Sequence, residues 1–484
     1  MSTQAYKELS VATNTALDLL GFSKEMIKSR VELCKHSASI FTDKFQNLFP
    51  WFDFDVMITG SVGDGIAKHP ESDIDVIQVF RNFLCLDNAQ VESELCIIQA
   101  ITADSPPGYT QLNPVEMDSN IFAMGLFSFT AEYDLSKGQV FLLSTCMRNL
   151  LDIGRETLSS YFAYDGTKRE HREQQGPSNP LTVHLKIHLM PYMDQSCDVD
   201  CVLAMPYISL TVLDSWSKRD RYWPSQSVCQ EIMDTEAYVV PVGASCSENQ
   251  NYEWRISFTT AESILVSHLN TVLLKIYILF KMANKYFIKP NCDLLSSYMI
   301  KNVMFWVSEH IEPSTCYSPE RLLDLLLQAL AFLLSCLDSK FLPNYMIQER
   351  NLLLGKGKPC DITQLKCIIS NLLDTGGFFI FRIEKLKVKI LSIEKCLTDA
   401  KRLSEMKDKF EMMFLRIGIV ITTKLSREEI CQSSFIYDVM FEIIKDPVCL
   451  DVILTLMKFL NLDLISLITN PQQIWKAISD FLFS

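Results

Sequence analysis

Hydrophobic and polar residues change their spacing about halfway along the chain. In the first half, short runs of β-prone residues alternate with turn-forming residues, which predicts strands at 54–59, 74–80, 121–130, 139–144, 181–190 and 199–205. The segment 2–48 has apolar residues on one side of a helix, and a further helical pattern at 142–162 overlaps one of the strands. The first half is therefore predicted to be mixed α/β.

From residue 260 onward the pattern becomes almost wholly helical. Apolar residues recur at helical spacing in a series of segments: 261–287, 296–309, 319–337 and several more between 361 and 484. The series is interrupted by Gly355, Gly357 and Pro359, which are residues that break helices and indicate a linker. We therefore expect a helical lobe followed by an appended helical unit.

The composition is typical of a large folded protein. With 484 residues, 48% hydrophobic and 21% charged, the chain is long enough for one large or two to three ordinary globular units. The first ten residues lack a basic region followed by an apolar run, so we expect no secretory signal and a location in the cytoplasm or nucleus. The apolar stretch 322–337 contains Asp324 and Gln328 and is shorter than a bilayer span, which predicts a core helix and no membrane association.

The net charge limits how the protein can contact nucleic acid, and the cysteines bear on disulfides and zinc binding. A net charge of −13 excludes a protein coated in basic residues, so any contact with nucleic acid must use a local patch. The 16 cysteines are scattered, and the closest pair, Cys197 and Cys201, flanks a predicted strand on which two ligands converge poorly. We therefore expect reduced core thiols and no zinc.

One segment carries a recognisable chemistry, ITGSVGDGIAKHPESDIDVIQVF at 58–80. Gly60 allows the backbone to approach an anion closely, and Ser61 offers a hydroxyl group and a backbone N–H. Gly63 and Gly65 keep the turn open before the start of a helix. These features together predict a turn that binds phosphate groups.

Aspartates follow this turn at a spacing that suits a metal ion. Asp73 and Asp75 are two residues apart, so on a strand their side chains project from the same face. A third carboxylate would complete two oxygen-rich Mg²⁺ sites, and the strand-like segment 197–205 supplies Asp200, with Asp198 on the same face as its rival. The combination favours phosphoryl transfer.

The ordered set of motifs resembles the Mab-twenty-one nucleotidyltransferases, and within them the animal cyclic GMP-AMP synthase-like (cGAS-like) receptors. The resemblance covers residues 24–354 and rests on GSVGDG at 60–65, SDID at 72–75, DVDCVLA at 198–204, EWRISF at 253–258, LLSSYMIK at 294–301 and LPNYMIQERNLL at 342–353. It implies a bilobal fold of the α/β (α+β) class, with a mixed sheet, an N-terminal spine helix and a helical C-terminal lobe. The regions expected on this basis are a spine helix region (1–50), a nucleotidyltransferase core (51–250), a helical lobe (251–358) and a helical C-terminal extension (359–484).

The resemblance also implies roles for individual residues. It makes Gly60 and Ser61 the triphosphate-binding turn, and it selects Asp200 over Asp198 as the third metal ligand beside Asp73 and Asp75. Further nucleotide contacts are implied at positions that match the family motifs: Arg255, Ser257, Lys281, Ser297, Tyr298 and Lys301. A tyrosine stacked on a base and lysines near phosphates are chemically suited to these roles.

The expected activity is nucleotidyl transfer with Mg²⁺ or Mn²⁺. We expect the metal to activate a ribose hydroxyl group of ATP or GTP, with Asp200 as its general base. By resemblance, two successive transfers yield a cyclic dinucleotide, which acts through a downstream receptor in innate antiviral signalling. No His/Cys cluster separates Ser257 from Lys281, so the zinc-binding insertion of the DNA-sensing vertebrate synthase is absent.

Double-stranded RNA, in preference to DNA, is the expected activator. A stripe of lysines on the first helix and a second basic cluster supply the candidate phosphate contacts: Lys24, Lys28, Lys35, Lys218, Arg219 and Arg221. A plain solvated face is the alternative explanation, because residues 1–45 contain six Lys/Arg and five Asp/Glu, an excess of only 6 − 5 = 1.

Two other functions are compatible with the same motifs. The first is a catalytically silent binding or scaffold protein that keeps the fold without turnover. Three clustered carboxylates weigh against it, since they repel one another unless a metal neutralises them. The second is an enzyme that adds nucleotides to RNA ends without a template, which would make linear rather than cyclic products.

Overall fold

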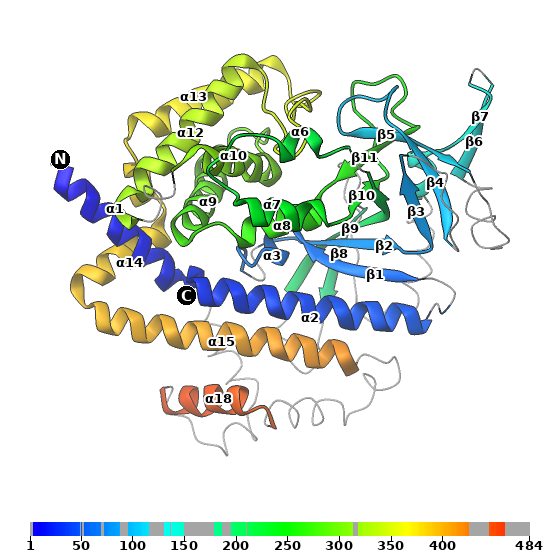
Figure 1. The fold of residues 1–484 in the computed structure, drawn as a ribbon. Helices are drawn as coiled ribbons and strands as arrows, with labels where there is room; N and C mark the ends of the chain where they lie inside the picture. Colours follow the sequence, from blue (N-terminus) through cyan, green and yellow to red (C-terminus); the bar gives the residue numbers. More distant parts are fainter. Residues whose placement is uncertain are drawn as a thin grey trace. The chain divides into compact units, whose positions relative to one another are not determined.

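A computed structural model describes residues 3–48, 50, 53–68, 72–87, 95–115, 130–135, 137–149, 179–185, 195–209, 211–312, 318–424 and 445–459. The chain forms two compact units, and Figure 1 follows their elements along the sequence by colour. The first unit contains Met1–Lys24, Arg81–Met147 and Ala204–Ala400. The second contains Glu25–Phe80, Arg148–Leu203 and Lys401–Ser484. Each unit therefore combines segments that are far apart in the sequence.

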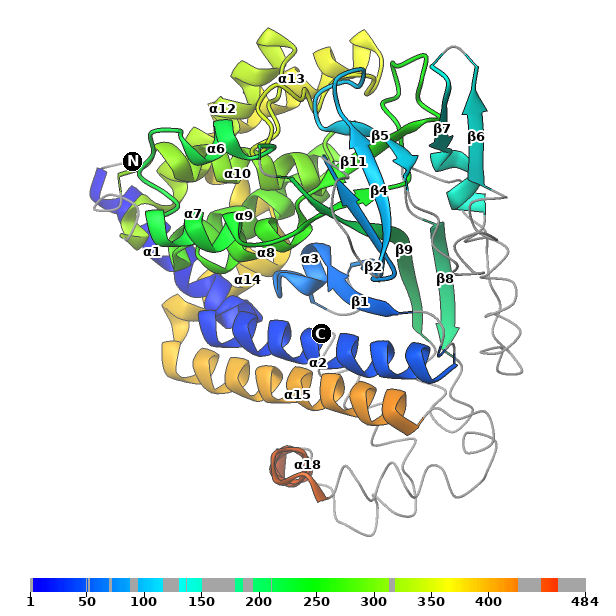
Figure 2. The ribbon, with the colours of Figure 1, turned by 45° about the vertical axis from the view of Figure 1, so that its right-hand side comes forward.

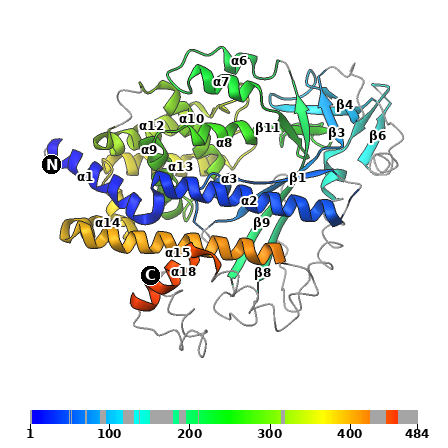
Figure 3. The same ribbon diagram turned by 60° about the horizontal axis from the view of Figure 1, so that its bottom comes forward.

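Two long helices run side by side in the second unit. They are α2 (Lys24–Leu48) and α15 (Leu397–Lys424), and the views in Figures 1, 2 and 3 agree on their arrangement. The shorter helix α18 (Pro447–Phe459) is tied to α15 by two ion pairs, Lys409–Asp451 at 3.3 Å and Arg416–Asp446 at 2.6 Å. The spine helix α2 and the part of the C-terminal extension from Lys401 onward thus belong to the same unit.

The same unit contains the strands that carry the predicted phosphate turn and aspartates. β1 (Phe54–Thr59) and β2 (Ile74–Phe80) are antiparallel, and the short helix α3 (Gly60–Gly63) follows β1 directly. β2 lies next to β9 (Gln195–Ile208), which also pairs with β8 (Asn179–Leu185) in antiparallel fashion. The two segments of chemical interest are thereby placed on neighbouring strands.

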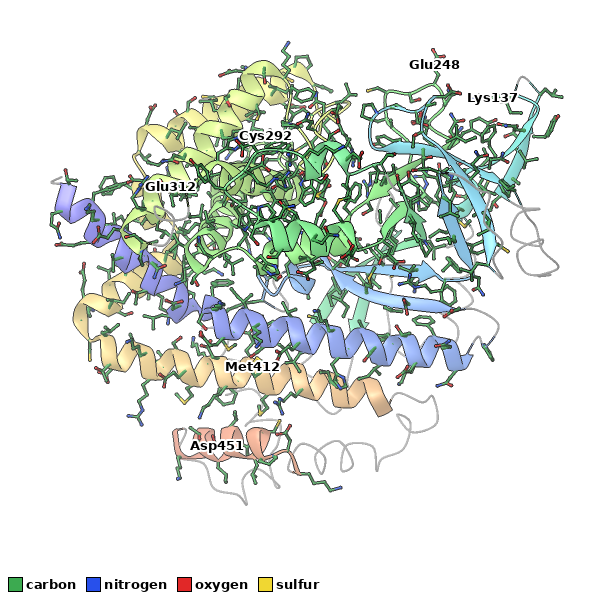
Figure 4. The ribbon with its side chains drawn as sticks, in the orientation of Figure 1. Lys137, Glu248, Cys292, Glu312, Met412 and Asp451 are labelled. Atoms are coloured by element: carbon green, nitrogen blue, oxygen red, sulfur yellow. The ribbon has the colours of Figure 1, made fainter. Side chains whose placement is uncertain are left out.

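The strands of the first unit form a closed series of pairings. The order is β9, β10 (Ala237–Val240), β11 (Glu253–Ser257), β5 (Tyr109–Pro114), β4 (Cys96–Ile101) and β3 (Phe83–Leu86). β3 is parallel to β4, and it also pairs in parallel with β9, where Cys85 lies opposite Tyr207. Both of these side chains are fully buried. A hairpin of β6 (Ala131–Asp134) and β7 (Gln139–Leu142) carries Lys137, which is labelled in Figure 4.

Helices make up most of the rest of the first unit. They are α1 (Thr3–Leu17), α6 (Asp214–Ser217), α7 (Gln226–Met233), α8 (Thr259–Ser267), α9 (Thr271–Ala283), α10 (Ser297–His310), α12 (Leu322–Ser339), α13 (Pro359–Asp374) and α14 (Glu384–Lys395). Shorter 3₁₀ and π segments lie at Asp18–Phe22, Asn284–Ile288, Pro319–Arg321 and Phe378–Arg382. The prediction of an α+β protein with a mixed sheet and a helical C-terminal region is confirmed.

Helix α12 is the core of this helical group. Its leucines at positions 326, 330, 333 and 337 are fully buried, and the helix packs against α1, α9, α10 and α13. Among the described helices, Pro319–Ser339 is long and apolar enough to cross a membrane, but half of its most apolar window is buried inside the protein. Such burial is typical of a core helix, as the sequence predicts.

Two predicted helices are broken. The first, over 2–48, is interrupted by Gly21, which has a φ of 81°, and by Ser23, which is extended. The second, over 261–287, divides into α8 and α9 with a bend of 118°. Asn270 causes the second break, because its side chain accepts a hydrogen bond from the Leu273 amide and caps the new helix. Apolar spacing continues through both breaks, so the pattern alone does not reveal them.

The strand predictions were accurate for runs of β-prone residues in the first half of the chain. β1 and β2 have the predicted bounds, and β7, β8 and β9 overlap their predicted segments. Residues 121–129 of the predicted strand 121–130 and most of the predicted helix 142–162 lie outside the described residues. The strands β3, β4, β5, β6, β10 and β11 were not predicted. β3 and β10 have four residues each, and β5 is rich in polar residues. None of these three segments therefore shows a clear alternation of apolar and polar residues in the sequence.

Gly355 and Gly357, which were predicted to form a linker, lie in a closely packed turn. Both have positive φ, of 69° and 62°. A side chain on Gly355 would collide with Ser245, and one on Gly357 would lie 2.8 Å from Leu294. Pro359 then occupies the first turn of α13, which packs on α12. The turn therefore joins helices of one unit.

Candidate functional site

The closest contact in the predicted phosphate turn is between Gly60 and Asp75. Gly60 follows β1 with a φ of 64°, and Asp75 lies on β2 opposite Thr59. A Cβ atom at Gly60 would overlap the Asp75 carboxylate. Only glycine meets both the backbone conformation and this contact. The turn therefore begins directly beside one of the predicted metal ligands.

Backbone hydrogen bonds hold the turn after Gly60 in a compact shape. The Ser61 carbonyl accepts from the amides of Ile66 at 3.0 Å and Ala67 at 2.9 Å. The Gly60 carbonyl accepts from the Asp64 amide at 2.9 Å. Ser61 is 9% exposed, so its side chain lies inside the turn. The helical part, α3, has four residues only and contains Gly60 and Gly63. A helix starting after Gly65 was predicted, but the described residues 66–68 are not helical.

Three aspartates lie on the two neighbouring strands, and a fourth directly precedes one of them. Asp73, immediately before β2, is exposed, and Asp75 is half-buried. On β9, Asp198 and Asp200 are both half-buried, with their backbones opposite Thr182 and Pro180 of β8. Because they are two residues apart on one strand, they share a face. The strand geometry therefore keeps both Asp198 and Asp200 available as the third carboxylate.

No three His, Cys, Asp or Glu side chains in the described part of the chain are grouped closely enough to hold a metal ion. The gathering of Asp73, Asp75 and Asp200 around Mg²⁺ therefore stays a prediction, as does the expectation that zinc is not used. The three aspartates suit a hard cation such as Mg²⁺, since all three supply carboxylate oxygens. They lie on, or directly before, the neighbouring strands β2 and β9.

Two of the predicted nucleotide-binding residues lie in the first unit, on β11. Arg255 and Ser257 are two residues apart on β11 and share a face. The backbone of Arg255 is opposite Tyr109 of β5, whose ring carries the guanidinium of Arg350 at 5.2 Å. Burial, followed by the charge of Arg350, lowers the pKa of Arg255. Two arginines are thus concentrated around one tyrosine.

Tyr298 is held by a short hydrogen-bonded series on the helices of the first unit. Its hydroxyl group donates to Glu262 of α8 at 2.9 Å and accepts from the Asn344 side chain at 2.9 Å. Burial, together with the nearby Glu262 carboxylate, raises the pKa of Tyr298 to about 12, so the hydroxyl stays protonated. Since 36% of Tyr298 remains exposed, part of its surface is accessible while the hydroxyl is fixed. This arrangement suits a stacking platform.

The remaining predicted nucleotide contacts differ in exposure. Ser297 is the first residue of α10 and is exposed, whereas Lys301, one turn further along, is 7% exposed. Lys281, near the end of α9, is half-buried. The cap of α10 is formed by Ser296, which accepts from the Met299 amide at 3.2 Å. Ser297 is therefore not needed to start the helix.

Sequence reasoning missed Glu262, Asn344 and Arg350. Glu262 comes four residues after the EWRISF segment, and the other two belong to LPNYMIQERNLL. The segments were noticed as motifs, but no spacing shows that Asn344 and Glu262 both bond to Tyr298. Their signal was polarity inside an apolar setting, since Asn344 is 2% and Glu262 is 7% exposed.

The lysine stripe on α2 is exposed. Lys24, Lys28 and Lys35 all face solvent, and Lys28 forms an exposed ion pair with Glu32 at 3.8 Å. The opposite side of α2 is buried, including Met26 and Arg30. The exposure agrees with the predicted helix face, and a role in binding nucleic acid stays a prediction.

The second basic cluster serves mainly internal contacts. The Arg219 side chain is 13% exposed, lies 4.3 Å above the Trp306 ring, and pairs with Glu309 at 3.1 Å. Arg221 donates to the backbone carbonyl groups of Trp216 and Arg219. Lys218 is exposed and paired with Asp214 at 3.2 Å. These contacts favour a structural role for Arg219 and Arg221, and the predicted contact of this cluster with nucleic acid stays a prediction.

Comparison with known families is informative for the helices of the first unit. Residues 264–371 match the model of the Mab-21 protein HhH/H2TH-like domain. The chain therefore carries a Mab-21 domain. This is consistent with the Mab-21 (Mab-twenty-one) family and with a nucleotidyltransferase fold.

The Mab-21 domain includes Lys281, Ser297, Tyr298 and Lys301. It extends through most of α13, beyond the predicted end of the helical lobe at residue 358. The phosphate turn and the aspartates lie outside it. The four serial regions predicted from the sequence also differ from the two compact units, because each unit combines three separate stretches.

Proposed function

We propose that this protein is an active nucleotidyltransferase that binds a nucleoside triphosphate at the turn beginning with Gly60. The observation that carries the proposal is the packing of the Asp75 carboxylate against Gly60. A phosphate-binding turn and a metal-binding carboxylate must be adjacent, since the metal is shared between the carboxylates and the phosphate oxygens. The Mab-21 domain supports the same class of protein.

Each residue has a distinct role in this proposal. Gly60 and Ser61 bind the triphosphate, and Asp73, Asp75 and Asp200 hold Mg²⁺. When bound, Mg²⁺ would neutralise phosphate charge and favour ionisation of the attacking hydroxyl group. The Asp200 carboxylate accepts the proton of that ribose hydroxyl. Asp73 and Asp75 orient the reacting phosphate by fixing the charge beside the turn.

For the first unit, taken by itself, we propose recognition of a nucleobase. Tyr298 presents its exposed surface for stacking, while Glu262 and Asn344 restrict the rotation of its ring. Arg255 and Ser257 supply hydrogen-bond donors from β11, and Lys281, Ser297 and Lys301 supply further polar contacts. A site with preformed donors and a fixed aromatic ring loses little conformational entropy on binding.

The product and the activator form the finer part of the proposal. We propose that ATP, GTP or both are joined into a cyclic dinucleotide for innate antiviral signalling, with double-stranded RNA as activator. Support comes from the family resemblance of the motifs and from the exposed lysine stripe on α2. A catalytically silent scaffold remains the alternative, and a tailing enzyme would yield linear products.

One experiment distinguishes these functions. The full chain is incubated with ATP, GTP and Mg²⁺, with and without double-stranded RNA or DNA, and pyrophosphate and nucleotide products are measured. We expect RNA-dependent pyrophosphate release and a cyclic product, both abolished by the double substitution Asp73→Asn, Asp75→Asn. Linear products would indicate tailing. Binding of nucleotide without pyrophosphate release, in the parent as in the double variant, would support the scaffold.

A further inference from the structure

The C-terminal helix α15 places a carboxylate between two cations of the second unit. Glu411 accepts two hydrogen bonds from Arg30 of α2, at 2.5 Å from Nε and 2.9 Å from Nη2. Lys68, just after the predicted phosphate turn, lies 3.5 Å from the same carboxylate. Met412, the next residue of α15, is labelled in Figure 4. Three distant segments therefore meet at Glu411.

Burial makes this group energetically significant. The side chains of Arg30, Glu411 and Lys68 are 3%, 14% and 26% exposed. Burial alone would raise the pKa of Glu411, but hydrogen bonds and charge from Arg30 and Lys68 outweigh it and lower that pKa. Burial lowers the pKa of Lys68 despite the nearby carboxylate. Arg30 is therefore the dominant partner, and loss of Glu411 would remove the carboxylate that pairs with this buried charge.

The same arginine reaches the phosphate turn. Arg30 Nη1 donates to the Gly65 carbonyl at 3.2 Å, and Cys34 of the same helix donates to the Val62 carbonyl at 3.5 Å. Gly65 has a φ of 71°, and a Cβ there would lie 2.5 Å from the Ile27 carbonyl of α2. The turn is thus packed directly on α2, at the point where Glu411 fixes the Arg30 side chain.

We propose that Glu411 is a positioning residue, through which the C-terminal extension holds the phosphate turn in its binding conformation. Glu411 aligns Arg30 for its bond to Gly65 and restrains Lys68 at the end of the turn. The role assigned to the turn rests on the proposed function, whereas the bracing of the turn does not. The part of the extension from Lys401 onward is thereby a structural part of the unit that contains the phosphate turn.

The test compares Glu411→Ala with Glu405→Ala in the full chain. Both residues lie on α15, and Glu405 is exposed, so the pair matches the change in helix propensity and charge. Hydrogen exchange is measured for the amides of Ile66 and Ala67, which bond to Ser61. We expect about tenfold faster exchange of these amides in Glu411→Ala, with amides in the first unit unchanged. Glu405→Ala should match the parent.

Kinetics provide the second measurement. In an active enzyme, Glu411→Ala should raise the KM for the triphosphate about tenfold and change kcat much less, since positioning affects binding of the phosphates. Parental exchange of Ile66 and Ala67 in Glu411→Ala would overturn the proposal. Faster exchange in a protein without turnover would keep the bracing role and reject only the proposed enzyme function.

A milder variant covers the case in which Glu411→Ala does not fold. Lys68→Gln removes the weaker ion pair of a side chain that is 26% exposed, and it leaves Arg30 paired. We expect a smaller increase, about threefold, in the exchange of the same two amides. Unchanged exchange in a folded Lys68→Gln variant would contradict the part of the proposal that concerns Lys68.

Discussion

Gly60 and Asp75 lie against each other, although fourteen other residues separate them in the sequence. The Asp75 carboxylate occupies the space in which any other residue at position 60 would place its Cβ atom. The positive φ of Gly60 turns the chain away from β1 at this point. The proposed phosphate turn and the proposed metal ligand are therefore one structural feature, and a change in either should affect both.

The first prediction separates this contact from backbone strain. Gly60→Ala should lose triphosphate binding and turnover, because the methyl group displaces the Asp75 carboxylate. Gly138→Ala is the matched control, since Gly138 has the same φ of 64° and its nearest neighbour would be 3.8 Å away. Both variants should lose about 1–2 kcal/mol of stability from the left-handed backbone. Activity assays and thermal unfolding measure the difference, and equal activity in the two variants would exclude a role for the contact.

The second prediction decides between the two aspartates of β9. Asp200→Asn should reduce pyrophosphate release at least a hundredfold, because an amide is a poor ligand for Mg²⁺ and accepts no proton. Asp198→Asn should retain most of the activity. The two substitutions are isosteric and lie on the same strand, so each is the control for the other. The reverse result would transfer the third-ligand role to Asp198.

The third prediction concerns the ring of Tyr298. Tyr298→Ala should weaken nucleotide binding by about 1–3 kcal/mol through loss of stacking. Tyr298→Phe keeps the ring and loses only the bonds to Glu262 and Asn344, so its effect should be smaller. Nucleotide titration of both variants measures the two contributions. If Tyr298→Ala binds nucleotide as the parent does, the base lies elsewhere.

The fourth prediction tests whether Arg219, in the second basic cluster, has a structural role. Arg219→Ala should lower the free energy of unfolding by about 3–5 kcal/mol, because it leaves Glu309 buried without its partner. Lys218→Ala, next to it and exposed, should change stability by less than about 1 kcal/mol. Chemical denaturation measures both values. A small effect of Arg219→Ala combined with weaker RNA binding would favour the predicted contact with nucleic acid instead.

The fifth prediction addresses the activator. The triple substitution Lys24→Glu, Lys28→Glu, Lys35→Glu should suppress RNA-dependent synthesis and flatten its dependence on salt. A triple variant with the same change in net charge on exposed lysines of other helices and loops, Lys356→Glu, Lys395→Glu and Lys401→Glu, should respond as the parent does. Activation by DNA alone, or an unaltered response to RNA in the first variant, would reject the RNA model.

Local pattern was sufficient for the parts of the site that are close in sequence. The bounds of β1 and β2 follow from runs of apolar, β-prone residues, and the turn between them follows from the glycines. The same pattern missed the break at Asn270, because a helix cap is one hydrogen bond and does not change the spacing of apolar residues. Prediction from local sequence therefore succeeded for the strands and the turn, and failed where a single side-chain hydrogen bond ended a helix.

The sequence by itself determined the bounds of β1 and β2, the glycine turn between them and the chemical character of the aspartates. Tertiary structure alone decided which charged residues are buried and what they contact. Arg30 and Glu411 are 381 positions apart, and nothing in the spacing of either helix indicates their pairing. Arg219 looked like its exposed neighbour Lys218 until packing placed it on Trp306. The physical reason is that the environment of a charge depends on the distant segment that covers it, whereas the periodicity of a sequence records only local backbone geometry.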